Sequence, residues 1–242
     1  MNNYRLFKFR VINKYLIDSL VRGVLYFSHP DRLNDPFDCR VDIKKSAINA
    51  VSKLSGKKKD NLLNLTRTSD FDRIQKVIGN VGICSFSLVL ENSLLWSHYA
   101  NEHQGLCLTY RIPESFINDK SNEITGVPRV EYGDNPLTDW FIENTPEYPN
   151  FDFKKFIKEI IKKVLTIKST CWNYEEEVRI IRQKQSSLKI PKEYLKQVCF
   201  GLNTPETDID LIKDIISNSG YKVSYCKMKR NESDFGLEAE DL

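Results

Sequence analysis

The sequence predicts a single α+β domain built on a mixed β-sheet, with a helical insertion at about residues 43–78. Short runs of β-branched and aromatic residues alternate with amphipathic segments of helical spacing, and neither a repeat nor a linker divides the chain. Its 242 residues, 40% hydrophobic and 11% aromatic, suffice for a real core. We place the domain at residues 1–230 and expect an acidic, mobile tail at 231–242.

Composition narrows the class of protein further. The formal net charge of +3 permits an acidic partner, but a dedicated nucleic-acid module is usually more basic. No run approaches the roughly 18 apolar residues of a membrane span, and the N-terminus lacks the apolar core of a signal peptide. We therefore expect a cytoplasmic protein without membrane contact. The six cysteines are scattered without a Cys-x-x-Cys pair, which is typical of small buried hydrophobes in a reducing compartment.

Each element is predicted from the spacing of its apolar residues. Alternating or continuous apolar runs predict strands at residues 4–9, 24–28, 82–88, 106–110, 129–132, 174–180, 197–201 and 221–229. Spacings of three and four predict helices at residues 13–22, 43–78, 92–103, 153–165 and 205–217. The lysine run 57–59 interrupts the second helical segment as a solvated loop or a phosphate contact. A connection rich in Pro, Asp and Asn, which contains Trp140, spans residues 133–152.

The stretch at residues 171–182 concentrates charge on a predicted strand. Strand alternation places Glu175, Glu177 and Arg179 on one face, with the carboxylates roughly 6–7 Å apart, and turns Glu176 to the other face. Neighbouring carboxylates repel each other, so a protein that keeps both needs a cation, a ligand or water there. Both could address one ligand, and Arg179 could hold a phosphate. A solvated charge ladder on an edge strand explains the same pattern.

Two other stretches offer polar groups. Ser85 and Ser87 share one strand face, and buried hydroxyls need partners, which a neighbouring strand, a ligand or a catalytic glutamate would supply. No Gly-x-Ser-x-Gly turn surrounds them, which argues against a serine nucleophile. The segment from Asn34 to Asp38 is explained by turn chemistry, because Asn and Asp bond their own backbone and Pro fixes φ.

The predicted helix at residues 92–103 carries aromatic and histidine side chains. Trp96, Tyr99 and His103 fall on one stripe, which is typical of a core face and also of an aromatic cradle. His98 and His103 are five residues apart, so they do not share a face as a metal-binding pair would. We predict no metal site.

The combination of these motifs resembles the bacterial family called domain of unknown function 2971. The matching residues are Leu6-Phe-Lys8-Phe, Leu25-Tyr-Phe-Ser28 with Asn34-Asp-Pro-Phe-Asp38, Ser85-Phe-Ser87, Trp96-Ser-His-Tyr-Ala100 with His103-Gln-Gly105, and Trp172-Asn-Tyr-Glu175-Glu-Glu177-Val-Arg179. The resemblance covers roughly residues 4–201, and the family has no stated function.

The order of a basic first strand, Ser-x-Ser and Glu-x-Glu is more distantly similar to the Arg–Ser–Glu class of ADP-ribosyltransferases. That resemblance implies a split β-sheet core and NAD as the substrate. It implies that Glu177 is the catalytic carboxylate and that Glu175 orients the acceptor. A carboxylate there would stabilise the positive charge that develops on the ribose when the glycosidic bond breaks.

The remaining site residues are assigned on the same hypothesis. Residues expected to bind NAD are Lys8, Asn34, Ser85, Ser87, Tyr99 and Arg179. Residues expected to bind the target are His98, His103, Trp172 and Tyr174. Arg5 and Arg10 compete with Lys8 for the NAD phosphates, and Lys8 is chosen because it falls on the family motif.

Three functions therefore remain open. The leading hypothesis is an NAD-dependent ADP-ribosyltransferase acting on protein or nucleic acid, in the role of a bacterial toxin or phage-defence effector with a neutralising antitoxin. The second is a metal-dependent phosphodiesterase or nuclease using Asp35, Asp38, His98, Glu175 and Glu177. The third is a non-enzymatic module that binds nucleic acid or a partner through the 57–59 lysines and exposed aromatic side chains. We expect Glu177→Gln to remove activity without affecting folding.

Overall fold

The computed structural model describes residues 3–147 and 152–242 and confirms the α+β class. The helices are α1 (Lys14–Arg22), α2 (Ile43–Lys53), α3 (Gly56–Thr66), α4 (Asp70–Ile78), α5 (Ser93–Tyr99), α6 (Glu114–Asn118), α7 (Pro136–Asn144), α8 (Phe153–Val164) and α9 (Glu206–Asn218). Short 3-10 turns are η1 (Pro30–Arg32), η2 (Lys120–Asn122), η3 (Thr170–Glu175) and η4 (Lys192–Tyr194). The strands are β1 (Asn3–Arg10), β2 (Val24–Phe27), β3 (Gly82–Ser87), β4 (Leu106–Pro113), β5 (Ile124–Gly126), β6 (Glu131–Tyr132), β7 (Ile167–Lys168), β8 (Glu177–Arg182), β9 (Ser186–Lys189), β10 (Leu195–Phe200), β11 (Ser224–Arg230) and β12 (Leu237–Asp241).

The main β-sheet opens in its middle. Within the described residues, eight strands follow the order β12-β11-β10-β4-β1-β3-β8-β5, and β10 and β11 are parallel. β1 pairs with β4 along its whole length, from Asn3↔Pro113 to Arg10↔Leu106. In these same residues β1 and β3 share one register pair, Phe7↔Ser87. The sheet therefore divides into a larger wing ending at β1 and a smaller wing of β3, β8 and β5.

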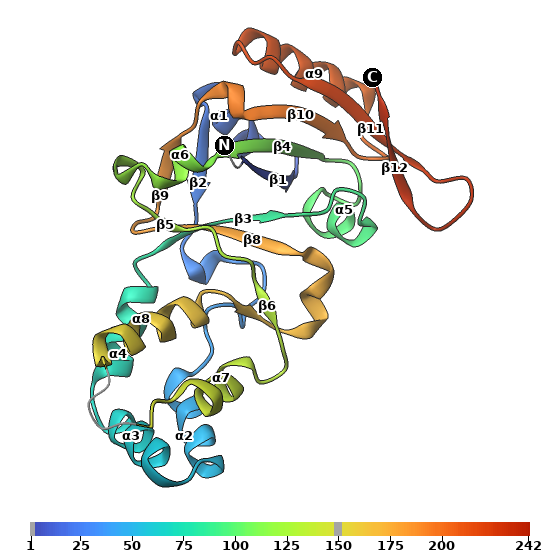
Figure 1. The fold of residues 1–242 in the computed structure, drawn as a ribbon. Helices are drawn as coiled ribbons and strands as arrows, with labels where there is room; N and C mark the ends of the chain where they lie inside the picture. Colours follow the sequence, from blue (N-terminus) through green and yellow to red (C-terminus); the bar gives the residue numbers. More distant parts are fainter. Residues whose placement is uncertain (1–2, 148–151) are drawn as a thin grey trace.

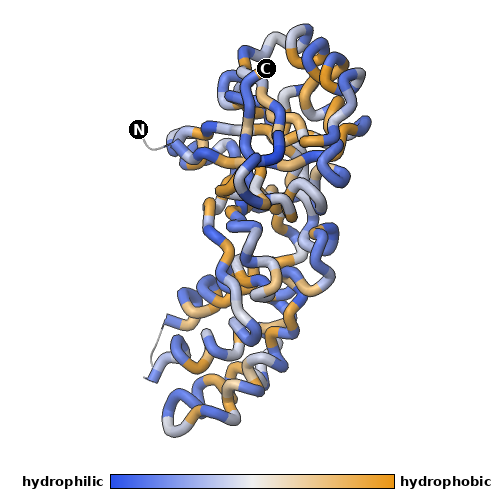
Figure 2. Tube along the Cα trace, turned by 90° about the vertical axis from the view of Figure 1, so that its right-hand side faces the viewer, coloured by the Kyte–Doolittle hydropathy of each residue, from blue (hydrophilic) through white to orange (hydrophobic). Residues whose placement is uncertain are grey.

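A separate lobe of helices lies beside the smaller wing (Figure 1). The expected insertion at residues 43–78 corresponds to α2, α3 and α4, and α7 and α8 join them from later in the chain. This lobe has its own apolar core, in which Ala47, Leu62 and Ile160 have no exposed surface. Figure 2 shows hydrophobic and hydrophilic segments alternating along these helices, as expected for amphipathic helices packed on one another.

Local sequence explains α1, which lies against the larger wing. The Asn13 side chain accepts from the backbone N–H groups of Tyr15 and Leu16, and this N-cap fixes the start of the helix. Gly23 ends it at φ 61°, a left-handed conformation that glycine adopts without strain. Leu16 and Leu20 are buried in the core of the sheet, while Asp18 and Ser19 of the same helix line the cavity described below.

Two expected polar connections are helical instead. The lysine run 57–59 lies in the first turns of α3 rather than in a loop, because Gly56 turns the chain at φ 55° and lysine is a good helix former. The connection predicted at residues 133–152 contains α7, whose Trp140 stacks on Phe156 of α8 with ring centroids 5.6 Å apart. Residues 148–151 of that connection lie outside the described residues.

Two other expectations also differ from the structure. The helix predicted at residues 92–103 ends at Tyr99, because Asn101, Glu102 and His103 follow with positive φ and cannot continue it. The tail at 231–242, which we expected to be mobile, ends in β12 at the edge of the sheet. Lys229 of β11 forms salt bridges to Glu238 and Glu240 of β12, so two acidic residues of the tail pair with a cation on the neighbouring strand.

Among residues 3–147 and 152–242, we find no helix with the length and apolar character that crossing a membrane requires.

Candidate functional site

A cavity of about 830 Å³ lies where β1 and β3 separate. This volume falls in the range of sites for small molecules and cofactors. Lys8 and Arg10 of β1 line it, as do Ser85 and Ser87 of β3. Asp38, Lys168, Glu175 and Glu177 also line it. We call Lys8 and Arg10 the β1 wall, and we call Asp38, Lys168, Glu175, Glu177 and Arg179 the carboxylate wall.

Backbone pairing places the carboxylate wall beside the two serines. In the register of β3 and β8, Ser87 is opposite Glu177 and Ser85 is opposite Arg179. The register therefore brings the Ser-x-Ser motif beside the second glutamate of Glu-x-Glu. Glu175, however, belongs to the 3-10 turn η3 and not to the strand, and Glu176 turns the chain into β8 at φ 42°. This bend exposes Glu176 while leaving Glu175 and Glu177 buried.

Arg179 holds the Glu177 carboxylate through hydrogen bonds to both of its oxygens. Its Nε donates to Glu177 Oε1 at 2.8 Å, and its Nη2 donates to Glu177 Oε2 at 3.0 Å and to Asp38 Oδ2. Its Nη1 donates to the Leu165 carbonyl at 2.8 Å and to Cys39 Sγ at 3.4 Å. These contacts use all five N–H donors of the guanidinium. Arg179 thus has no donor left for a phosphate, in contrast to the predicted contact with NAD.

Lys168 joins the two glutamates. Its Nζ lies 2.6 Å from Glu175 Oε2 and 3.3 Å from Glu177 Oε2, and the Trp172 ring covers it with a centroid distance of 4.8 Å. Burial alone would lower the pKa of Lys168, but Glu177 and Glu175 raise it above its ordinary value. The side chain is therefore an ammonium ion held inside the protein.

The two carboxylates have unlike environments. Burial alone would raise the pKa of Glu177, but Arg179, Lys168 and a hydrogen bond from Ser85 lower it to about 2. Burial raises the pKa of Glu175 above its ordinary value, and the lowering by Lys168 and by the Tyr99 hydroxyl is too small to reverse this. Glu177 therefore stays ionised, whereas Glu175 is the carboxylate closer to exchanging a proton at neutral pH.

Tyr99 and Ser87 hold Glu175 in place. The Tyr99 hydroxyl donates to Glu175 Oε1 at 2.5 Å, and the Asn34 amide donates to the Tyr99 oxygen at 3.4 Å. The Ser87 hydroxyl lies 2.7 Å from the Glu175 carbonyl and accepts from the Val89 N–H at 3.0 Å. Ser87, predicted to bind NAD, thus anchors the backbone of Glu175. Ser85 is half-buried and lines the cavity.

The β1 wall carries cations with fewer internal partners. Lys8 Nζ donates to the Ser85 carbonyl at 2.8 Å and lies 5.0 Å from the centroid of the Phe86 ring. Arg10 lies two residues further on the same strand and lines the same cavity. Arg5 is exposed and stacks its guanidinium over Phe7. The structure therefore brings two of the three candidate cations, Lys8 and Arg10, to the cavity.

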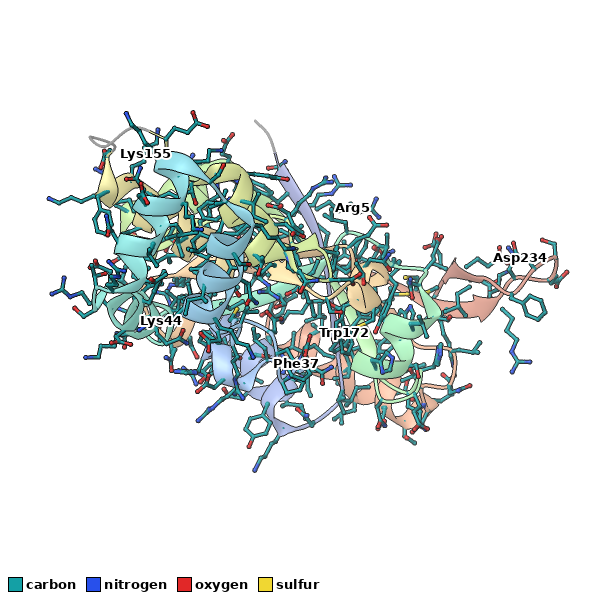
Figure 3. All side chains as sticks on the ribbon, turned by 90° about the horizontal axis from the view of Figure 1, so that it is seen from below. Arg5, Phe37, Lys44, Lys155, Trp172 and Asp234 are labelled. Atoms are coloured by element: carbon teal, nitrogen blue, oxygen red, sulfur yellow. The ribbon has the colours of Figure 1, made fainter. Side chains whose placement is uncertain are left out.

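The residues expected to bind the target separate into two places. His98 stacks on Tyr174 with a centroid distance of 6.2 Å and contacts the Trp172 ring at the same centroid distance. Figure 3 labels Trp172 near the centre of the molecule, with Lys44 and Lys155 in the helical lobe on one side and Asp234 in the β11–β12 hairpin on the other. We call His98, Trp172 and Tyr174 the aromatic cluster.

His103, in contrast, lies in a backbone contact between strands. Its carbonyl accepts from the Asn203 N–H at 3.0 Å, in the loop after β10. A Cβ on Gly105 would lie 2.3 Å from the Arg10 carbonyl, and one on Gly201 would lie 2.1 Å from the His103 carbonyl. Close packing of the backbone therefore explains the glycine of the His103-Gln-Gly105 motif.

Sequence reasoning missed Lys168 and the role of Asp38. The available signal for Lys168 was a lysine directly after the apolar run Val164-Leu-Thr-Ile, just before Trp172, because a lysine buried there must meet acidic partners. Turn chemistry alone was enough to explain Asp38. Its hydrogen bond with Arg179, 141 residues later, cannot be predicted from residue spacing.

The residues proposed for a metal site have other partners. Asp35 Oδ1 accepts from the Phe37 N–H at 2.9 Å, and His98 belongs to the aromatic cluster. Glu175 and Glu177 already face Lys168 and Arg179. In the described part of the chain, no group of three or more His, Cys, Asp or Glu is arranged to hold a metal ion. The geometry thus gives the phosphodiesterase hypothesis little support.

The fold and the cavity define an α+β protein with a buried, charged site between the wings of an open sheet. Residues 95–180 match the model of a family described as a protein of unknown function, DUF2971, which confirms the family resemblance over this segment. The segment contains the aromatic cluster and all of the carboxylate wall except Asp38. Neither a curated protein nor a solved structure matches the chain.

Proposed function

We propose that this protein is an NAD-dependent ADP-ribosyltransferase that transfers ADP-ribose to a protein or nucleic-acid acceptor. The observation that carries the proposal is the cavity where β1 and β3 separate, which is lined both by Lys8 and Arg10 of β1 and by the buried carboxylates Asp38, Glu175 and Glu177. A dinucleotide presents this same contrast, because its pyrophosphate is anionic while its glycosidic carbon becomes cationic during cleavage.

The charge of the carboxylate wall suits such a reaction. Asp38, Glu175 and Glu177 carry three negative charges when ionised, and Lys168 and Arg179 carry two positive charges, which leaves a net charge of −1. A net negative, preorganised and water-poor wall stabilises positive charge on a ribose more in the transition state than in the ground state. In the ground state of NAD the positive charge is spread over the nicotinamide ring, and it moves onto the ribose as the glycosidic bond breaks.

The proposed transfer assigns a role to the polar groups of each wall. Breaking the bond between the ribose carbon and the nicotinamide nitrogen sends the electron pair to the nitrogen, and nicotinamide leaves as a neutral molecule. An oxygen or nitrogen of the acceptor then forms the new bond to that carbon, and its proton passes to Glu175. Glu177 stays ionised beside Arg179 and stabilises the ribose cation, while Lys8 and Arg10 hold the pyrophosphate.

The test is the release of nicotinamide and the transfer of label from adenine-labelled NAD to a bacterial lysate, with and without a chelator. We expect transfer in both conditions, and its loss in Glu177→Gln. Glu176→Gln is the matched control, because its side chain is exposed one residue away. Unchanged transfer by Glu177→Gln would contradict the assignment. Nucleic-acid degradation that the chelator abolishes would favour the phosphodiesterase, and salt-sensitive binding without turnover would favour the binding module.

We propose a cytoplasmic toxin or phage-defence effector, held in check by an antitoxin, as its biological role. This part of the proposal is supported by the resemblance to small transferases. It predicts that expression in a bacterial host depletes NAD or modifies a host molecule and arrests growth, whereas Glu177→Gln does neither. Normal growth at matched levels of the wild-type protein would contradict it.

A further inference from the structure

Lys168 is a buried cation to which the proposed reaction assigns no step. Its side chain is 4% exposed, although lysine is almost never fully buried without a partner. It lines the cavity, and its Nζ contacts carboxylates from three separate segments: Asp38 after η1, Glu175 in η3 and Glu177 in β8. Among the described residues, no other cation forms ion pairs with all three of these carboxylates.

The contacts of Lys168 are unequal. Its Nζ is 2.6 Å from Glu175, 3.3 Å from Glu177 and 3.8 Å from Asp38. Glu177 and Asp38 also have Arg179, but the other bond to the Glu175 carboxylate is from the neutral Tyr99 hydroxyl. Removing Lys168 would therefore leave Glu175 without a cation, while Glu177 would keep one.

We infer that Lys168 is a positioning residue that keeps Glu175 ionised and aimed into the cavity, so that Glu175 accepts the acceptor's proton while Glu177 remains a fixed anion. This inference rests on the proposed function for its chemistry. The Trp172 ring over the ammonium group completes the enclosure, and Trp172 in turn packs against His98 of the aromatic cluster.

Several titratable groups share this environment. Glu175 faces Tyr99 of α5, Lys168 of β7, Tyr174 of η3 and Glu177 of β8. Lys168 also faces Asp38, and Glu177 also faces Arg179, Cys39 and Tyr132. The cation nearest to Glu175 is Lys168, so its neutralisation should act first on that carboxyl.

The experiment compares Lys168→Met and Lys168→Arg with the wild-type protein. Lys163→Met is the matched control, since Lys163 pairs with the exposed Glu131 outside the cavity. Nicotinamide release from NAD is measured against pH, and the titration of Glu175 is followed by NMR of labelled glutamate carboxyls. Should Lys168→Met fail to fold, Lys168→Gln removes the same charge while keeping a hydrogen-bond donor.

Loss of the cation should raise the pKa of Glu175, so the acid limb of the rate profile should move up by about one to three pH units. Lys168→Arg should restore the limb to near its wild-type position, and Lys163→Met should not move it. A uniform fall in rate with an unmoved limb would mean that Lys168 is merely structural and would overturn the inference.

The NMR titration separates this failure from a failure of the proposed function. If the wild-type protein released no nicotinamide at any pH, the transferase proposal would fail. The inference about Lys168 would still be decided by the carboxyl titration. A higher pKa of Glu175 in Lys168→Met, with Glu177 still ionised, supports the inference about Lys168. An unchanged pKa of Glu175 refutes it.

Discussion

The carboxylate wall and the β1 wall face one cavity but are built in opposite ways. In the carboxylate wall, Arg179 has all of its donors bonded and Lys168 lies between two glutamates. In the β1 wall, Lys8 donates to one backbone carbonyl and stacks on an aromatic ring. The first wall is therefore internally saturated and rigid, whereas the second keeps donor capacity for a ligand. Changes to the first should reduce stability, and changes to the second should reduce binding.

The strongest test of this contrast is Arg179→Met. The substitution keeps much of the volume but leaves Glu177 and Asp38 buried without their main cation, so we expect a loss of about 3–5 kcal/mol in the free energy of unfolding. Chemical denaturation measures it. Arg182→Met is the control on the same strand, and it should cost less because its partner Glu123 is 33% exposed and also pairs with Lys184. Equal losses in the two variants would contradict the special role of Arg179.

Glu177→Gln should reduce both activity and stability, which corrects our expectation that folding would be unaffected. The pKa of Glu177 falls from its ordinary 4.5 to about 2 in the folded protein, equivalent to about 3 kcal/mol. Because the folded pKa is the lower one, this stabilisation is present above about pH 4.5 and is lost as the pH falls toward 2. Denaturation at pH 7 and at pH 3 should therefore show a difference from wild type that shrinks in acid. A difference independent of pH would contradict the assigned pKa.

Ser87→Ala tests the hydrogen bond by which Ser87 of β3 anchors the backbone of η3. Without the hydroxyl, the buried Glu175 carbonyl and the Val89 N–H lose a partner, so we expect about 1–3 kcal/mol of destabilisation. Ser85→Ala should cost less stability, because Ser85 is only half-buried, yet it should reduce nicotinamide release. The reverse ranking in thermal denaturation would show that Ser87 is not the anchor.

The smallest effect on stability is expected for Lys8→Met. A partly exposed bond to the Ser85 carbonyl and the contact with the Phe86 ring are lost, each at about 1 kcal/mol or less. Binding of NAD, measured by calorimetry, should weaken about tenfold because a charged contact to the pyrophosphate is removed. Arg5→Met is the control, since Arg5 is exposed on the same strand and stacks on Phe7. Equal weakening in both variants would place the pyrophosphate outside the cavity.

Local patterns predicted the elements that need only their own residues. Asn13 and Gly23 bound α1 through capping, and the apolar run before Arg182 forms β8. The Glu177 and Arg179 pair was predictable because strand alternation puts residues i and i+2 on one face. The predictions failed where a distant segment decides the outcome. β12 forms because β11 offers a pairing edge, and the helix α5 stops where three left-handed residues follow it.

The sequence by itself determined the α+β class, the placing of Glu177 and Arg179 on one strand face, and the separation of Glu176 from the other two glutamates. Only the tertiary structure decided that the sheet opens between β1 and β3, and that Lys168 reaches both carboxylates. It also decided that Arg179 is turned inward. The physical reason is that strand spacing acts over a few residues, whereas burying a charge requires partners that the fold brings from far along the chain.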